Sequence, residues 1–231
     1  MIDHYDWAGG REAMLRFGPD TGPVVVAALP LFEEANRTRA LVVTILRLLA
    51  ERGIAGALPD LPGQGESLVP THCTSLLKMQ DAFSFACDKF DRDGRNCYAL
   101  GVRSGVLLDV LAALAGRWHF APMPGEKLLR ELRRTATASD PQHHDLDSLV
   151  LGGDTPIEIA GNLLAPRLLS ELPTARPAPD ARIVRLGSDA ADADYKVEGS
   201  PLWRRAEPDN DPALAALLAD DIVAWVHACE S

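Results

Sequence analysis

The chain has 231 residues, and its 23 lysines and arginines against 33 aspartates and glutamates give a formal net charge of −10 at pH 7. This acidic balance argues against a nucleic-acid partner, because no excess of positive charge is present to replace the counterions of a phosphate backbone. The longest apolar runs, residues 24–31 and 40–46, are too short to cross a bilayer, and the N-terminus lacks the basic and apolar pattern of a signal peptide. The cysteines show no CxxC pair and no regular spacing (Cys73, Cys87, Cys97 and Cys229). We therefore expect a reduced, cytoplasmic protein with no membrane span and no disulfide framework.

The first half of the chain alternates between two kinds of segment. Residues 24–29 form a short β-branched run between Gly22-Pro23 and Pro30, which is typical of a buried strand. Residues 38–52 follow with the apolar stripe of an amphipathic helix, and Gly53 stands where a helix commonly ends. The same reasoning predicts further strands and helices in alternation (strand 54–58, helix 75–90, strand 96–101, helix 106–114). This order indicates a parallel sheet with crossover helices, whose active groups lie at the carboxyl ends of the strands.

The second half is less regular. The pattern allows a strand at 118–122, a basic amphipathic helix at 126–134, a polar loop or domain edge at 137–147, a strand at 181–186 and a closing helix at 212–228. The basic helix is typical of a solvated face rather than a binding patch. The whole chain, residues 1–231, is thus expected to form one α/β domain, with a small helical excursion, a possible cap, at about residues 122–172.

The segment Leu100-Gly101-Val102-Arg103-Ser104-Gly105 lies where a strand turns sharply into a helix. This is the setting of the nucleophile elbow, G-x-S-x-G, in which small flanking residues permit a strained turn. Here the central residue is Arg103, which stays protonated and cannot attack a carbonyl. Ser104 is the neighbouring hydroxyl, one position late. Two glycines at such a junction also fit close packing alone, but the preceding strands favour the elbow.

Two loops after predicted strands carry further polar groups. The loop of residues 59–67 contains the pattern D-x-x-G-x-G-x-S, which is frequent in α/β-hydrolases beside the active site; its candidate binding residues are Gly63, Glu66 and Ser67. A plain proline–glycine turn is the alternative. The loop of residues 29–39 follows the first core strand, where α/β-hydrolases place an oxyanion donor. Its candidate binding residues are Glu33, Glu34, Asn36 and Arg37, although Asn36 or Thr38 could instead cap the following helix.

These segments (LPLFEEANRTR, LPDLPGQGES and LGVRSG), together with IEIAGNLLAP and SPLWRRAEP, resemble the exosortase A system-associated hydrolases of the α/β-hydrolase superfamily, in the branch with arginine at the elbow. The resemblance spans about residues 23–225. It implies an α/β-hydrolase core with a predominantly parallel sheet, a cytoplasmic location and a genomic association with exopolysaccharide and protein-sorting loci. It does not imply a particular reaction, because one fold serves many functions.

The other members of a catalytic triad are tested against the chain order nucleophile, acid, histidine. Asp189 follows the strand at 181–186, where the acid is expected; Asp192 and Asp194 are alternatives, and a solvent-facing turn explains all three equally well. Residues 195–211, where the histidine belongs, contain none. A polar cluster (Asp140, His143, His144, Asp145 and Asp147) lacks a second cluster at metal-ligand spacing, so we expect neither a metal nor another cofactor.

Two classes of function follow from this. The protein could hydrolyse an ester, thioester or related acyl compound with a reorganised site in a single cleft formed by Glu33, Glu34, Asn36, Ser67, Arg103 and Asp189, with Ser104 as a further catalytic candidate. Arg103 would then bind a carboxylate or phosphate of the substrate or stabilise an oxyanion. Alternatively, it is an inert relative that binds an anionic metabolite or a partner from the same pathway, which the missing histidine favours. In either case a buried guanidinium needs a carboxylate partner. We expect that partner to be Glu34 in preference to Glu33.

Overall fold

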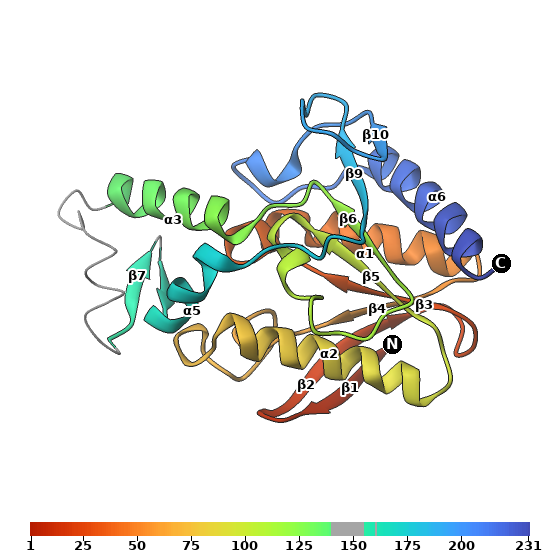
Figure 1. The fold of residues 1–231 in the computed structure, drawn as a ribbon, viewed down its shortest axis with the longest axis horizontal. Coiled ribbons are helices and arrows are strands. Elements are labelled where there is room, and N and C mark those ends of the chain that lie inside the picture. Colours follow the sequence, from red (N-terminus) through yellow and green to blue (C-terminus); the bar gives the residue numbers. More distant parts are fainter. Residues whose placement is uncertain (140–154, 160) are drawn as a thin grey trace.

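The computed structural model describes residues 1–139, 155–159 and 161–231, and its centre is an eight-stranded sheet in the order β1-β2-β4-β3-β5-β6-β9-β10 (Figure 1). The strands of this sheet are β1 Ile2–Trp7, β2 Gly10–Phe17, β3 Val24–Ala28, β4 Ala55–Pro59, β5 Cys97–Val102, β6 Gly116–Phe120, β9 Arg182–Leu186 and β10 Tyr195–Val197. All pairs from β4 to β10 are parallel, whereas β1 and β2 pair antiparallel with each other and β2 with β4. The predicted α/β class with a predominantly parallel sheet is confirmed.

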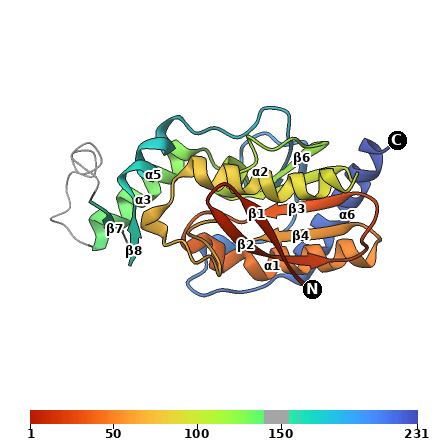
Figure 2. The same ribbon diagram turned by 90° about the horizontal axis from the view of Figure 1, so that it is seen from below.

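Helices cover both faces of the sheet (Figure 2). The helix α2 (Leu76–Arg92) lies on one face, and α1 (Glu33–Glu51) and α6 (Pro212–Cys229) lie together on the other. Two separate apolar clusters result, one on each face, as expected for strands buried on both sides. Of the described helices, α6 is long and apolar enough to cross a membrane by length and composition. Here one of its sides is buried in the apolar cluster that it shares with α1.

The central strands agree with the sequence-based prediction. All five residues of β3 and all six of β5 are buried, as a continuous apolar run predicts. Gly53 adopts a φ of 81°, a left-handed conformation that ends α1 at little steric cost to glycine. The Ser75 side chain accepts a hydrogen bond from the Lys78 N–H and caps α2.

The start of α1 differs from the prediction. The helix begins at Glu33 rather than at residue 38, and neither Asn36 nor Thr38 caps it. Phe32, with a φ of 62°, turns the chain directly from β3 into the helix. Glu33 and Glu34 then lie in the first turn, where carboxylates are stabilised by the helix dipole. The Thr38 hydroxyl instead donates to the Glu34 carbonyl oxygen at 2.8 Å, within the helix.

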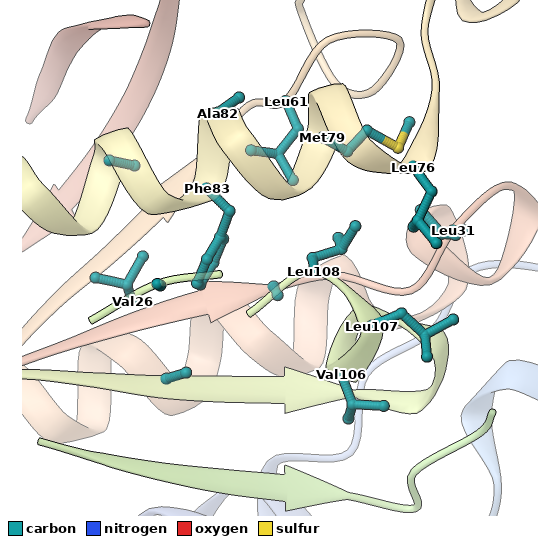
Figure 3. Close-up of a cluster of buried hydrophobic side chains, with 14 of the residues drawn as sticks. Val26, Leu31, Leu61, Leu76, Met79, Ala82, Phe83, Val106, Leu107 and Leu108 are labelled. Atoms are coloured by element: carbon teal, nitrogen blue, oxygen red, sulfur yellow. The ribbon is translucent and has the colours of Figure 1, made fainter. Parts of the chain in front are cut away.

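The segment after the elbow also differs, because no α-helix forms at residues 106–114. One 3-10 turn, η2 (Arg103–Leu107), follows β5, and the apolar residues Val106, Leu107 and Leu108 pack beneath α2 (Figure 3). Side chains satisfy the carbonyl groups that a helix would have paired. The Gln80 amide donates to the Leu107 oxygen at 2.8 Å, and the Arg117 guanidinium donates to the oxygens of residues 109 and 112. Apolar character alone could not distinguish burial as a helix from burial as a turn.

The sequence analysis missed several elements. The N-terminal hairpin β1–β2 extends the sheet, and β10 ends it on the other side. The excursion between β6 and β9 contains α3 (Gly125–Ser139), α5 (Pro166–Glu171) and an antiparallel pair, β7 (Ile157–Ile159) with β8 (Asn162–Leu164). It is therefore not purely helical. Figure 1 shows this excursion beyond one end of the sheet, next to the start of α1.

Candidate functional site

A pocket of about 520 Å³ lies at the carboxyl ends of β3 and β5, between the sheet and the excursion. Its inner wall comes from the elbow and from the first turn of α1, and its outer wall comes from α3, from the β7–β8 pair and from the 3-10 turn η4 (Leu202–Arg204). The described residues that line it are Leu31, Phe32, Glu33, Glu34, Arg37, Arg103, Lys127, Leu128, Glu131, Leu132, Arg134, Thr135, Ile159, Asn162, Leu164, Trp203 and Arg204. This is the edge of the sheet where the strand order predicts a site.

Arg103 occupies the elbow position in a strained backbone conformation, with a φ of 54°. Left-handed backbone is uncommon for a residue other than glycine and is held only where the surrounding structure enforces it. Close packing enforces it here, since a Cβ at Gly105 would meet the Ala28 carbonyl oxygen at 2.2 Å. The glycine lets η2 approach the end of β3, and the turn then directs the Arg103 side chain into the pocket.

The Arg103 guanidinium is engaged on several sides. Its Nε and Nη2 donate to the two carboxylate oxygens of Glu34, each at 3.1 Å, in a bidentate ion pair. The guanidinium also lies 4.7 Å from the ring centroid of Trp203, and its Nη2 is 3.9 Å from a carboxylate oxygen of Glu131. Only 9% of the Arg103 side chain and 15% of that of Glu34 are exposed. The predicted pairing with Glu34, rather than with Glu33, is confirmed.

Burial raises the pKa of the Glu34 carboxyl above its usual range. The hydrogen bonds and charge of Arg103 lower that pKa, Glu131 raises it and Arg37 lowers it, but desolvation is the largest cause. Glu34 is therefore easier to protonate than an exposed glutamate. When it takes up a proton, Arg103 loses its bidentate partner while keeping its own charge.

Ser104 does not reach the pocket. It is fully buried, and its hydroxyl oxygen accepts a hydrogen bond from the Leu31 N–H at 2.9 Å. This bond ties the elbow to the loop after β3. The geometry gives Ser104 a structural contact and leaves it outside the pocket lining, so the position next to the elbow does not supply an exposed nucleophile.

Only some of the candidate residues in the two loops line the same pocket as Arg103. Glu33, Glu34 and Arg37 line the pocket, and the Arg37 guanidinium donates to the Trp203 carbonyl oxygen at 3.0 Å. Asn36 and Gly63 line a smaller adjoining hollow of about 140 Å³.

Glu66 and Ser67 lie away from both hollows. Glu66 is exposed, and the Ser67 hydroxyl donates to a carboxylate oxygen of Glu12 at 2.9 Å. The expected single cleft containing Asn36, Ser67 and Asp189 beside Arg103 is therefore wrong. Gly63 and Gly65 adopt left-handed backbone conformations in the 59–67 loop, and Ser67 after them contacts Glu12 of β2 rather than the elbow.

Asp189 lies after β9, as expected, but it does not line the pocket. Its carboxylate accepts hydrogen bonds from the Arg185 guanidinium at 2.8 Å and from the Ala191 N–H at 3.0 Å. These donors keep the pKa of Asp189 below its ordinary value, the Ala191 N–H being the largest cause. This pattern is that of a turn-stabilising aspartate.

Among the described residues, the one histidine whose ring is hydrogen-bonded to a carboxylate lies in the core. The His119 Nε2 is 2.7 Å from a carboxylate oxygen of Asp109, and neither side chain has any exposed surface. None of the described residues that line the pocket is a histidine, serine or cysteine.

Sequence reasoning missed the outer wall of the pocket. The helix α3, which we interpreted as a solvated face, presents Leu128, Leu132 and Thr135 to the pocket together with Glu131. Trp203 lies far along the chain in the segment SPLWRR. The spacing of residues 128, 132 and 135 was a visible signal for one helix face, but the sequence does not tell which surface that face covers.

The described residues contain no group of three or more histidine, cysteine, aspartate or glutamate side chains able to hold a metal. The polar cluster of residues 140–147 lies outside the described residues. In the pocket itself, three carboxylates and five cations are mixed with apolar side chains. This composition suits an organic anion.

No protein-family model matches the sequence, and no curated protein resembles it closely enough to be identified as a relative. Solved structures do match. Est1E from Butyrivibrio proteoclasticus aligns with 99% of this chain and 98% of its own, at 16% identity and a TM-score of 0.62; another structure of it holds ferulic acid.

The α/β-hydrolase GrgF from Penicillium sp. sh18 aligns with 99% of this chain and 96% of its own, at 14% identity and a TM-score of 0.59. The bottromycin epimerase BotH, in complex with bottromycin A2, covers 97% and 98% of the two chains at 17% identity and a TM-score of 0.52. Identities this low show the fold alone. With its mostly parallel eight-stranded sheet, its flanking helices and these neighbours, the chain has the α/β-hydrolase fold.

Proposed function

We propose that this protein binds a small organic anion in the Arg103 pocket and does not carry out serine-type hydrolysis. The observation that supports this proposal is the elbow itself. Where an α/β-hydrolase carries its nucleophile, this chain directs a guanidinium into a pocket of about 520 Å³ and holds it against Glu34 and Trp203.

The internal ion pair explains how such a ligand would be recognised. A carboxylate or sulfonate on the ligand offers Arg103 the same planar acceptor geometry as Glu34 does. Binding therefore replaces one anion by another. Trp203 remains as a platform for the guanidinium, and the apolar residues around it receive the body of the ligand. Glu34 acts in this proposal as an internal competitor.

We expect no stoichiometric labelling by a fluorophosphonate probe, because Ser104 is buried and no described serine lines the pocket. Labelling is measured by intact mass spectrometry, with a serine esterase as the positive control. The Arg103→Ser variant should remain a poor esterase toward a p-nitrophenyl ester, since none of the described residues that line the pocket is a histidine able to activate the serine. Stoichiometric labelling at Ser104, or a burst of p-nitrophenol from the variant, would contradict the proposal.

We expect the binding of an aromatic sulfonate to tighten as the pH falls. The sulfonate keeps its charge throughout, so the pH acts on the protein. Above the raised pKa of Glu34 the carboxylate holds Arg103, and below that pKa the proton releases Arg103 to the probe. Binding is then coupled to the uptake of one proton by Glu34. The affinity therefore rises by up to about tenfold per pH unit as the pH falls toward the raised pKa of Glu34, and it levels off below that pKa.

Titration calorimetry with 1-anilinonaphthalene-8-sulfonate measures this slope. The charged groups that act on Glu34 are Arg103, Arg37 and Glu131. Glu34→Gln should bind the probe more tightly at neutral pH and lose most of the pH dependence, whereas Arg103→Gln should bind it poorly at every pH. Glu131→Gln is the matched control and should keep the slope, with its pH range moved to lower pH because Glu131 no longer raises the pKa of Glu34. An unchanged slope in Glu34→Gln would assign the effect to another group.

Hydrolysis of an ester or thioester by a non-standard site is the alternative proposal. It is favoured by one observation, namely a carboxyl with a raised pKa beside a fixed guanidinium. Such a pair could activate water and stabilise an oxyanion. However, both carboxylate oxygens of Glu34 already accept hydrogen bonds from Arg103, which competes with the binding of a water molecule to them. Turnover of a p-nitrophenyl ester above the buffer rate, lost in both Glu34→Gln and Arg103→Gln, would favour this alternative.

The resemblance to the exosortase A system-associated hydrolases supports a cellular context for the ligand. We place it in an exopolysaccharide or protein-sorting pathway and the protein in the cytoplasm. The excursion at residues 122–172 would act as a cap, and the contribution of α3 and the β7–β8 pair to the pocket wall supports that role.

A further inference from the structure

The mouth of the pocket carries cations that the Arg103 ion pair does not explain. Lys127 and Arg134, seven residues apart on α3, and Arg204 in η4 are exposed and line the pocket. None of the three has a carboxylate within ion-pair distance among the described residues, although Lys127 lowers the pKa of Asp189 through its charge. Three cations without an ion-pair partner among the described residues therefore line one pocket of a chain whose net charge is −10.

Apolar side chains form a further part of the pocket wall. Leu128, Leu132, Ile159 and Leu164 line the pocket from the excursion, and Trp203 lines it beneath the Arg103 guanidinium. The pocket lining thus combines a buried cation, Arg103, with apolar side chains and with three exposed cations, Lys127, Arg134 and Arg204, which we call the cationic rim. The exposed Glu33 and the 40% exposed Glu131 also line the pocket, so the rim cations outnumber the carboxylates beside them by one.

We propose that the ligand is an elongated dianion with an apolar body. One acidic group pairs with Arg103 in place of Glu34, and a second acidic group, a carboxylate or a phosphate, meets the cationic rim. This proposal rests on the proposed function and adds the second anionic group to it. The two ends contribute differently: the buried pair with Arg103 is shielded from solvent, whereas the exposed rim acts through screened charges and attracts the ligand from solution.

The size of the pocket argues for a small molecule over a nucleic acid or an anionic membrane. A pocket of about 520 Å³ accommodates a drug-sized organic molecule, and it is the hollow toward which both anion-binding features face. The net charge of −10 also disfavours a large polyanion.

The test compares two probes of equal length, decanoate with one carboxylate and decanedioate with one at each end, by titration calorimetry. We expect decanedioate to bind more tightly to the unchanged protein. The rim variant (Lys127→Gln, Arg134→Gln and Arg204→Gln together) should weaken decanedioate binding by about tenfold and leave decanoate binding nearly unchanged, since each exposed charge contributes modestly. Raising the salt concentration should also reduce the preference of the unchanged protein for decanedioate over decanoate, because salt screens the exposed rim charges.

A matched variant controls for the loss of overall positive charge. Arg130, Arg167 and Arg176 are exposed, lie on or near the excursion and do not line the pocket. Replacing all three by glutamine removes the same charge and should preserve the preference for decanedioate. Far-ultraviolet circular dichroism and thermal unfolding verify that both triple variants are folded.

The outcomes separate the two proposals. If Arg103→Gln weakens neither probe, the proposed function itself fails. If Arg103→Gln weakens both probes but the unchanged protein does not prefer decanedioate, only the dianion proposal is overturned. Equal losses in the rim variant and in the control variant would also overturn it, because they would show an effect of net charge alone.

Discussion

Replacing Glu34 by glutamine is expected to lower the free energy of unfolding by about 3–5 kcal/mol, because it leaves the Arg103 guanidinium buried without its bidentate partner. Arginine cannot escape this cost by losing its proton. Replacing Arg103 by glutamine should cost less at low pH than at neutral pH, since Glu34 can then be neutralised by protonation. The strained backbone at residue 103 is common to arginine and glutamine, so it cancels in the comparison.

A double-mutant cycle measures the coupling between the two residues. The variant with both replacements should lose less than the sum of the single losses, because no buried charge remains unpaired. Unfolding in urea gives the four free energies. The control is Glu131→Gln, whose side chain is 40% exposed and 3.9 Å from Arg103, and which should cost no more than about 1 kcal/mol. Additive losses would show that Arg103 and Glu34 do not stabilise each other.

Replacing His119 by leucine is expected to destabilise the fold by a similar amount, about 3–5 kcal/mol, although His119 lies outside the pocket. It leaves the fully buried Asp109 carboxylate without its 2.7 Å partner, and the remaining cation, Arg117, has its Nε 3.6 Å away. The same aspartate belongs to the turn that replaces the expected helix after the elbow.

Unfolding in urea again provides the measurement, with Asp180→Asn as the matched control. Asp180 also pairs with Arg117, at 3.3 Å, but it is 67% exposed and its loss should cost less than about 1 kcal/mol. A loss in His119→Leu as small as that of the control would contradict a structural role for the buried pair.

Local patterns were sufficient to predict the core of the sheet. The short, continuous apolar runs of β3, β4 and β5 are typical of strands that are buried on both faces of a parallel sheet. All residues of these three strands are buried, so their composition was enough to predict them. The N-terminal hairpin β1–β2 was missed because its side chains are mixed, with Tyr5 and Met14 buried among exposed polar neighbours.

The sequence by itself determined that an arginine stands at the elbow, and elementary electrostatics then required a carboxylate nearby, which the preceding loop could supply. The sequence did not determine what else surrounds that arginine. Trp203 is 100 residues away along the chain and Glu131 lies on a helix that showed only an amphipathic pattern, so their positions depend on how the excursion packs against the sheet. The tertiary structure also decided which candidates were excluded: the glycine turns of the 59–67 loop carry Ser67 toward Glu12, and backbone packing buries Ser104. Charge pairing is a local requirement that a sequence can reveal, whereas the shape of a pocket is set by contacts between distant segments.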